Sequence, residues 1–468
     1  MTFEFCHLNL NVPLKFEIGT WEFRTMKTRN NNGYALPFIL MLAAVFLIFA
    51  AVVLGRSAYN QFQSKSVVDR VKALNLAEAG INYYMWHLSH NNTDYQDDTA
   101  QPANPPFGPY LHQYTDSSSN TIGTFTLTID PPTQGGNAVT VTSIGQPQNS
   151  SAIKTLQAQI GIPSFSGYVF VSATEAWFGE TEETTGKVLS NIGVHYDGVA
   201  NGPVMAANAT YTPSPEFGGD GEVHPGVWGT GGPQSYFQYP VPPVNFQQIT
   251  ADLKIIEDAA IAQGLRLGAS GQLGYSVNLN AANMTISKVT RERANGITTS
   301  SPHSYDYPQN GVLFIADNVW VSGTLGPSRK LTIASARLPD VSSTNTTIKI
   351  GGSVHYTQND GTNVLGLIAQ KDIIVPQYAP TNLKIDASLL AQKGHVYQPY
   401  YGKVFNSVEV YGSIATFDFW TWSWVDGYGH TVSGFQNTSL IYDEHLTLSP
   451  PPFYPKTGNY QILNWREQ

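Results

Sequence analysis

One uninterrupted apolar run dominates the hydrophobic pattern of the chain. Residues 35–54 read ALPFILMLAAVFLIFAAVVL and contain no charged side chain. A run of about twenty apolar residues is the length that crosses the hydrocarbon core of a bilayer as an α-helix. The sequence that follows, GRSAYNQF, has no small-residue cleavage site, so a retained membrane helix is favoured over a removed secretory signal.

The helical pattern continues beyond this run. Apolar side chains recur every three or four residues at Val67, Val71, Leu74, Ala77, Ile81, Met85 and Leu88. This spacing keeps one stripe of an α-helix apolar. Residues 34–90 are therefore expected to form one helical stem, about 80 Å long at the usual rise per residue. A rod of that length suits side-by-side packing.

Alternation of apolar and polar residues predicts a small sheet after the stem. Residues 91–120 are rich in turn formers and predict a linker. Residues 124–130 and 138–144 flank the segment PPTQGGN, which is a hairpin signal, and residues 153–160 supply a third strand. Residues 91–165 are interpreted as a linker and a small antiparallel sheet against the stem.

Short β-prone runs separated by Gly, Asn or Asp fill the remaining chain. Residues 166–300 form one block, which a helical pattern interrupts over residues 245–263, where Asn245 and Gln248 form a candidate capping box. Residues 301–468 form a second block, with runs about twenty residues apart. Stacked turns of a β-solenoid fit this spacing, and a β-sandwich is the alternative. The predicted class is α+β, a long helix followed by a mainly β body.

Composition excludes some classes of function. The net charge is −9 and no basic cluster with interleaved aromatic residues occurs, which argues against a nucleic-acid groove. A start at Met26 is favoured over the alternative of a long leader from Met1, because it gives the compact leader MKTRNNNG and leaves out Cys6, the single cysteine. A chain that begins there has no disulfide available.

The N-terminal region resembles the PilX type of minor pilins. The matching features are the leader charges Lys27 and Arg29, Gly33, Tyr34 at the start of the apolar run, and the motif Ala77, Glu78, Ala79, Gly80. The C-terminal part of the body also resembles an uncharacterised domain that recurs on PilX-like surface proteins.

The resemblance implies processing and partners. Residues 1–33 would be a leader that prepilin peptidase removes after Gly33, and Tyr34 would become the methylated N-terminus. The partners would be other pilins and the pilus assembly machinery. The helix would pass once through the cytoplasmic membrane, and the body would be exported to the pilus or cell surface. Phe38 stands where many pilins have a glutamate, which is a departure from major-pilin polymerisation.

Candidate chemistry is sparse. Gly-x-Ser-x-Gly, His-Glu-x-x-His and Walker motifs do not occur, so no catalytic residue, cofactor or metal is predicted. Asp97 and Asp98 are interpreted as a solvated loop face. Trp420, Trp422 and Trp424 alternate with Thr and Ser, which places three indoles on one strand face. Exposed, they would form a ligand platform for sugar rings; the favoured interpretation has them packed on the core.

The predicted function is that of a minor pilin-like component of a type IV pilus, not an enzyme. It would contribute to pilus assembly and display a β-rich domain for adhesion or aggregation, with surface glycans or other cells as candidate partners. The alternative is a membrane-tethered surface or pseudopilus protein with a glycan-binding or glycan-degrading β-helix.

Overall fold

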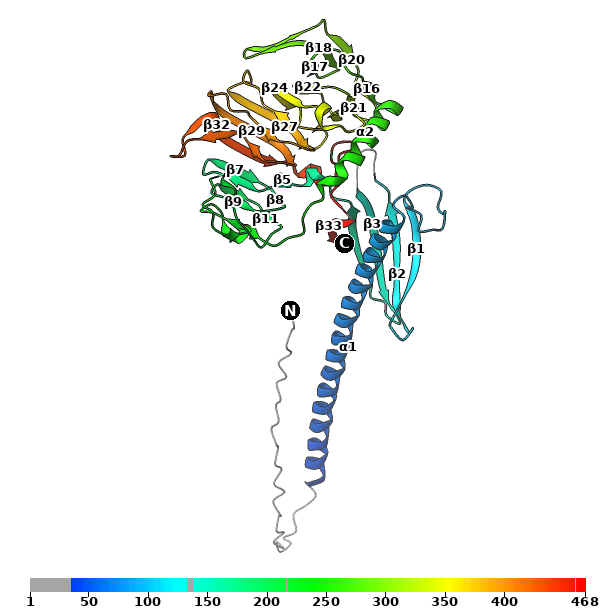
Figure 1. Ribbon diagram of the computed structural model, residues 1–468. Coiled ribbons are helices and arrows are strands. Elements are labelled where there is room, and N and C mark those ends of the chain that lie inside the picture. Colours follow the sequence, from blue (N-terminus) through cyan, green and yellow to red (C-terminus); the bar gives the residue numbers. More distant parts are fainter. Residues whose placement is uncertain (1–34, 133–137, 216–217, 459) are drawn as a thin grey trace. The chain divides into compact units, whose positions relative to one another are not determined.

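The structure is a computed structural model that describes residues 35–132, 138–215, 218–458 and 460–468 (Figure 1). The chain divides into two compact units, residues 1–67 and residues 68–468. Helix α1 (Ala35–His90) has 56 residues, so it begins in the first unit and ends in the second. A long N-terminal apolar helix followed by a large, mainly β body confirms the predicted class.

The first part of α1 is apolar on every side. Its large apolar side chains between Leu36 and Leu54 are each at least half exposed. An 18-residue window of the helix has a mean hydropathy of 3.0, and none of that window is buried. By length and composition, the helix is therefore able to cross a membrane.

A five-stranded antiparallel sheet belongs to the second unit. Its strands, in spatial order, are β1 (Phe107–Thr115), β2 (Thr121–Asp130), β3 (Ala138–Pro147), β4 (Lys154–Gly161) and β33 (Gln461–Glu467). The three predicted strands are confirmed. The linker predicted over residues 91–120 is wrong in part, because β1 lies within it. Only Tyr110 of β1 is buried, so this edge strand lacks the alternation that marks a half-buried strand.

The last strand ties the end of the chain to this sheet. Strand β33 pairs with β4, so the β body is inserted between two neighbouring strands. The segment that leads from β4 into the body and the segment that returns from the body to β33 are hydrogen-bonded to each other. The backbone N–H of Phe165 donates to the carbonyl of Pro455 at 3.1 Å, and that of Thr457 donates to the carbonyl of Pro163 at 2.8 Å.

Parallel ladders build the β body, in which each strand pairs with a strand from a neighbouring turn of the chain. One ladder contains β16 (Leu265–Leu267), β21 (Val312–Ile315), β23 (Lys330–Ser335), β25 (Val364–Ala369), β27 (Asn382–Ala391) and β29 (Val404–Thr416). A second contains β17 (Gly274–Leu279), β22 (Val319–Leu325), β24 (Ile348–Tyr356), β26 (Ile373–Ile374), β28 (Val396–Tyr397) and β30 (Trp420–Thr421).

Strands from early in the body extend these ladders beyond β29. The first ladder continues through β5 (Phe170–Ser172), β8 (Val188–Ser190), β11 (Val204–Ala206) and β15 (Phe237–Gln238). A branch from β29 contains β32 (Thr431–Tyr442), β7 (Glu182–Thr185) and β10 (Val199–Asn201). A separate parallel sheet contains β6 (Ala176–Phe178), β9 (Val194–Tyr196) and β14 (Val227–Trp228). The first two sets belong to one 23-stranded sheet with the ladders above.

The β body also contains antiparallel strand pairs outside the parallel ladders. They involve β18 (Met284–Arg293), β19 (Gly296–Thr299), β20 (His303–Tyr305), β31 (Ser423–Val425), and the pair β12 (Thr210–Tyr211) and β13 (His224–Pro225). The main ladders remain parallel, whereas the immunoglobulin-type sandwich is antiparallel. The parallel pairing favours the solenoid over the sandwich, and the solenoid stays a prediction.

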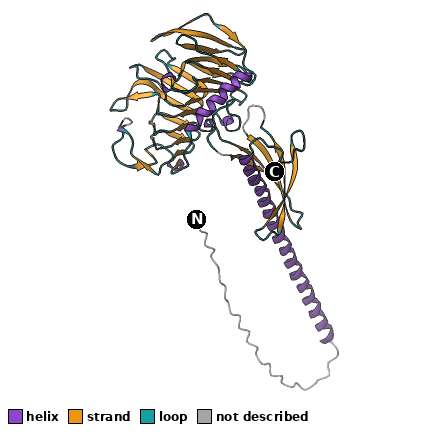
Figure 2. Ribbon diagram, turned by 45° about the vertical axis from the view of Figure 1, so that its right-hand side comes forward, coloured by secondary structure: helices purple, strands orange, loops and turns teal. Residues whose placement is uncertain are grey.

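Helix α2 (Ile249–Gln263) covers one face of the first ladder (Figures 1 and 2). The predicted helix is therefore confirmed, and its apolar spacing packs as expected. The side chains of α2 in this contact are Ile249, Leu253, Ile256 and Ala260, and those of the ladder include Val312, Phe314, Ala334 and Ile368. The side chain of Asn245 accepts the N–H of Gln247 in the turn before the helix. The side chain of Gln248 lies outside the described residues.

The opposite side chains of the ladder strands form the interior of the body. Leu313, Ile315, Ile333, Leu365 and Leu367 belong to this core, and each is fully buried. Successive side chains of a strand point to opposite faces. One face of these strands is covered by α2 and the other lies in the core. Burial of both faces explains why the strands are continuous apolar runs instead of alternating sequences.

Candidate functional site

The processing positions predicted from the sequence lie outside the described residues. These are Lys27, Arg29, Gly33 and Tyr34. The described part of the candidate assembly region therefore begins with α1, and its folded end is the contact between α1 and the small sheet.

The Ala77-Glu78-Ala79-Gly80 motif lies at this contact. Ala77 and Gly80 are buried, Ala79 is half-buried and Glu78 is exposed. A Cβ atom added to Gly80 would lie 2.3 Å from Oγ of Ser143 on β3. The glycine therefore lets the helix approach the strand more closely than an alanine would.

The sheet contributes a small residue of its own to the contact. A Cβ atom added to Gly145 would lie 2.1 Å from the carbonyl oxygen of Ala73 and 2.5 Å from the backbone nitrogen of Ala77. Real Cβ atoms essentially never come so close to backbone atoms. Small residues on both surfaces thus bring the backbones of α1 and β3 together, which gives the Ala77-Glu78-Ala79-Gly80 motif a physical reason.

The predicted apolar stripe lies on α1, and only its second part packs on the sheet. Ala77, Ile81 and Leu88 are buried against the sheet. Val67 and Val71 are 58% and 53% exposed. Periodicity identified an apolar stripe, but it could not tell where along that stripe the sheet begins.

We predict that Gly145→Ala destabilises the second unit. The added methyl group meets backbone atoms of α1, which cannot rotate away as a side chain can. Overpacking of this kind costs about 1–3 kcal/mol of the free energy of unfolding. Urea unfolding followed by tryptophan fluorescence measures the change.

Gly268→Ala is the matched control, since a Cβ atom there meets nothing within 4 Å. Equal stabilities of the Gly145→Ala and Gly268→Ala proteins would contradict close packing of α1 on β3.

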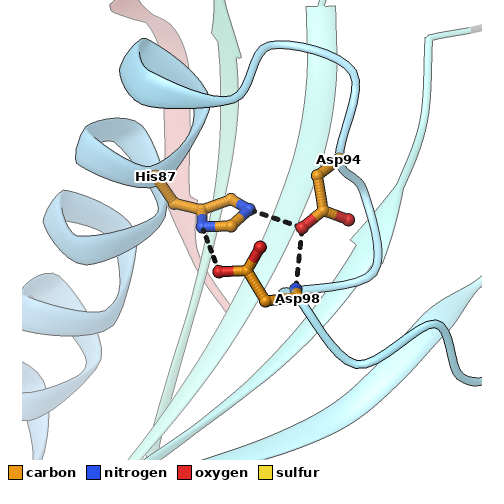
Figure 3. Close-up of side chains that lie close together, drawn as sticks. All are labelled: His87, Asp94 and Asp98. Atoms are coloured by element: carbon orange, nitrogen blue, oxygen red, sulfur yellow. Dashed lines mark hydrogen bonds and ion pairs between the residues drawn. The ribbon is translucent and has the colours of Figure 1, made fainter.

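A histidine and two aspartates close the end of α1 (Figure 3). His87, on the helix, is 4% exposed. Its Nε2 lies 3.1 Å from Oδ2 of Asp94, and its Nδ1 lies 3.9 Å from Oδ2 of Asp98. Asp94 also organises the loop, because its carboxylate accepts the N–H groups of Gln96 at 2.8 Å and Asp98 at 2.7 Å. We call His87, Asp94 and Asp98 the loop latch.

Electrostatics favour the ionised form of Asp94 in this latch. Burial alone would raise the pKa of the Asp94 carboxyl group. The backbone N–H groups of Gln96 and Asp98, together with His87, outweigh burial and lower that pKa below its usual value. The ionised carboxylate therefore stabilises the folded loop.

A second pair joins the same loop to the sheet. Nε2 of His112, on β1, lies 2.7 Å from Oδ2 of Asp97, and the Tyr83 hydroxyl donates to Oδ1 of Asp97 at 3.2 Å. Burial and the neighbouring Asp97 raise the pKa of Tyr83 to about 12, so the phenol remains a donor. The side chain of Asp97 is 4% exposed, whereas that of Asp98 is 78% exposed. The prediction of a solvated face is therefore wrong for Asp97.

The loop latch has the ligand types of a zinc site, but its contacts are explained without a metal. One ligand atom from each of His87, Asp94 and Asp98 lies within 4.8 Å of the others. Imidazole and carboxylate are ligands that zinc takes. Both oxygens of Asp94 already accept backbone N–H groups. The geometry is that of a latch between helix and loop. Sequence reasoning missed it, although the run His-x-x-His followed by three aspartates directly after a helix was a visible signal.

The tryptophan row does not present three exposed indoles. Trp420 and Trp422 are 5% and 0% exposed and belong to the interior of the body. Trp424 is half-buried, and its Nε1–H donates to the carbonyl of Gln398 at 2.8 Å. The favoured interpretation of core packing is confirmed for Trp420 and Trp422, and the alternative of an exposed platform is wrong for these two rings. Trp465, on β33, is exposed and pairs across to β4.

We predict that Asp94→Asn lowers the stability of the second unit at pH 7. Loss of a charge-assisted hydrogen-bond acceptor costs about 1–3 kcal/mol. The folded-state pKa of Asp94 is lowered, so its contribution is present above the unfolded-state value and is lost as pH falls through the folded-state value. The difference from the wild type should shrink below about pH 4.

Urea unfolding at a series of pH values measures this difference. Asp130→Asn, at the exposed end of β2, is the control. A difference between wild type and Asp94→Asn that stays constant down to pH 2 would contradict the ionised latch.

Comparisons with known proteins give little guidance. No family model matches the chain, and no curated protein matches it. Among solved structures, the chain is similar to the crystal structure of ComZ, a competence-associated pilin from Thermus thermophilus. The identity is 12%, the match covers 86% of this chain and 98% of that chain, and the TM-score is 0.29. A TM-score of 0.29 does not establish a common fold, so no functional conclusion follows from it.

Proposed function

We propose that the chain is a pilin-like minor component of a type IV pilus that carries a large β body on its stem. The observation that supports this most directly is the composition of α1. One continuous helix has a charge-free, exposed first part and a second part packed on an antiparallel sheet. The first part needs an apolar environment, and the second part connects that environment to a folded unit.

A membrane or a bundle of similar helices supplies that environment. Burial of apolar surface gains about 25 cal/mol per Å², and the apolar side chains between Leu36 and Leu54 are each at least half exposed in the single chain. Val67, Val68 and Val71 extend the exposed apolar surface toward the sheet. In our proposal, the helix lies in the cytoplasmic membrane before assembly and packs on neighbouring pilin helices afterwards.

The proposed processing rests on the resemblance of the leader to those of minor pilins. Prepilin peptidase would cut after Gly33 and leave Tyr34 as the N-terminus. The leader with Lys27 and Arg29 would stay in the cytoplasm, which also rests on that resemblance, because cationic residues lie on both sides of the apolar run. Phe38 replaces a carboxylate that could pair with a neighbour's terminal amine. A chain without that pairing suits a minor position in the fibre.

The β body would be the displayed part, with adhesion or aggregation as its role. Its ladders form one 23-stranded sheet with a helix on one face, so the stem carries a large folded domain. Other pilins and the assembly machinery are the proposed partners of the stem, and surface glycans or other cells are the proposed partners of the body.

We predict that Gly33→Asp blocks processing. Mass spectrometry of the N-terminal peptide from host membranes and from sheared filaments measures the outcome. The wild-type chain should begin at Tyr34 with a methylated amine and should occur in the sheared fraction. The Gly33→Asp chain should keep its leader and stay in the membrane fraction.

Gly55→Ala is the matched control, because a Cβ atom at Gly55 meets nothing within 4 Å. Its N-terminus should be that of the wild type. A wild-type chain that keeps its leader and is found only in membranes would contradict the pilin proposal and support a tethered surface protein.

A further inference from the structure

We propose that a cavity beside α2 binds a negatively charged saccharide. The cavity has a volume of about 990 Å³ and is bounded by α2, residues 307–311, residues 328–330 and the C-terminal segment 450–456. Ligand sites commonly have volumes of about 300–1,000 Å³. This proposal names a ligand for the β body and rests on the proposed function, in which the body is displayed at the surface.

The charge of the cavity is opposite to that of the chain. Its charged lining residues are Arg329, Lys330, Lys456 and Asp252, three cationic and one acidic. The whole chain has a net charge of −9. A positive cavity on an acidic protein attracts anions through the local field. The ligand therefore carries negative charge.

The cations are available to a ligand. None of Arg329, Lys330 and Lys456 forms an ion pair closer than 4.0 Å with another residue that the structure describes. Nζ of Lys330 donates to Oγ of Ser449, a neutral partner, and burial lowers the pKa of that ammonium group. A carboxylate or sulfate would supply the missing counter-charge.

An unpaired acceptor lies among these cations. Oδ2 of Asp252 is buried and has no hydrogen-bond partner within 3.5 Å among the described residues. Burial raises the pKa of the Asp252 carboxyl group, although the backbone N–H and the charge of Lys456 act in the opposite direction. Leaving a buried acceptor unsatisfied is costly, and a hydroxyl group that donates to it would remove that cost. An anion with no hydrogen-bond donor could not do so. The ligand therefore offers a donor as well as negative charge, and the hydroxyl groups of an acidic sugar supply one.

An exposed aromatic ring completes the cavity. Phe453, on the C-terminal segment, is 48% exposed and lines the cavity. The guanidinium of Arg329 lies 5.4 Å from the centre of the Tyr307 ring, and the Tyr307 hydroxyl donates to the carbonyl of Asn280, so this ring helps to hold Arg329 in place. Aromatic faces pack on the C–H faces of sugar rings. Cations, a buried acceptor and the Phe453 ring together fit an acidic saccharide.

Calorimetry on the full chain in detergent tests the proposal, with trigalacturonate and a sulfated heparin tetrasaccharide as probes. At least one probe should bind with a stoichiometry near one. The methyl ester of trigalacturonate is the neutral match for the first probe. Arg329→Gln and Lys330→Gln, singly and together, should weaken binding at least tenfold, and the ester should bind at least tenfold more weakly than the acid.

Arg291→Gln is the matched control, because Arg291 is an exposed arginine on β18 and does not line the cavity. Thermal unfolding of each variant shows whether it folds. If the Lys330→Gln protein does not fold, the Arg329→Gln variant, at an exposed position, tests the proposal by itself. Failure of both probes with the wild-type chain, equal binding of acid and ester, or binding that survives Arg329→Gln would overturn the proposal. Anionic vesicles or inorganic phosphate binding in place of the saccharides would also overturn it.

The N-terminal processing measurement is independent of this cavity. A chain that begins at Tyr34 but binds no acidic saccharide refutes the ligand and leaves the pilin proposal standing. An unprocessed chain that binds the saccharide supports the ligand and contradicts the pilin proposal.

Discussion

The close approach of α1 to β3 is the contact on which the rest of the molecule depends. Gly80 on the helix and Gly145 on the strand leave no room for a further carbon atom between the two backbones. The apolar beginning of α1 cannot persist exposed in water, and the β body cannot fix itself to that helix. The small sheet connects them, because it packs on the helix with one face and receives both ends of the body at β4 and β33.

The elements that could be predicted from the sequence are those in which the spacing of apolar residues matches the buried face. The charge-free run, the hairpin strands β2 and β3, and helix α2 with its spacing of Ile249, Leu253 and Ile256 each show the period of their own structure. Strand β1 was missed because it lies at an edge and buries only Tyr110. Strand β33 was missed because its sequence is exposed at nearly every position, and pairing of backbones leaves no mark on such a sequence.

The candidate sites were harder to predict, since they depend on where loops and faces meet. The contact between His87 and Asp94 requires the loop after α1 to turn back on the helix; the histidines and aspartates in the sequence indicate the residue types but not which of them meet. The three tryptophans do not share one strand face, because Trp420 lies on β30 and Trp424 on β31, and the turns stacked against them place only Trp420 and Trp422 inside. The cavity beside α2 joins segments more than a hundred residues apart, so its charge could not be read along the chain.

The insertion of the body between β4 and β33 sets an order of events during synthesis. Synthesis from the N-terminus delivers α1 and strands β1 to β4 first, and β33, the partner of β4, follows only after the β body. Until then β4 is an open edge, which exposes unpaired backbone groups to other chains. Completion of this sheet therefore marks a chain whose β body has been made in full. A chain that stops within the body keeps the unpaired edge of β4, which is open to pairing with other chains.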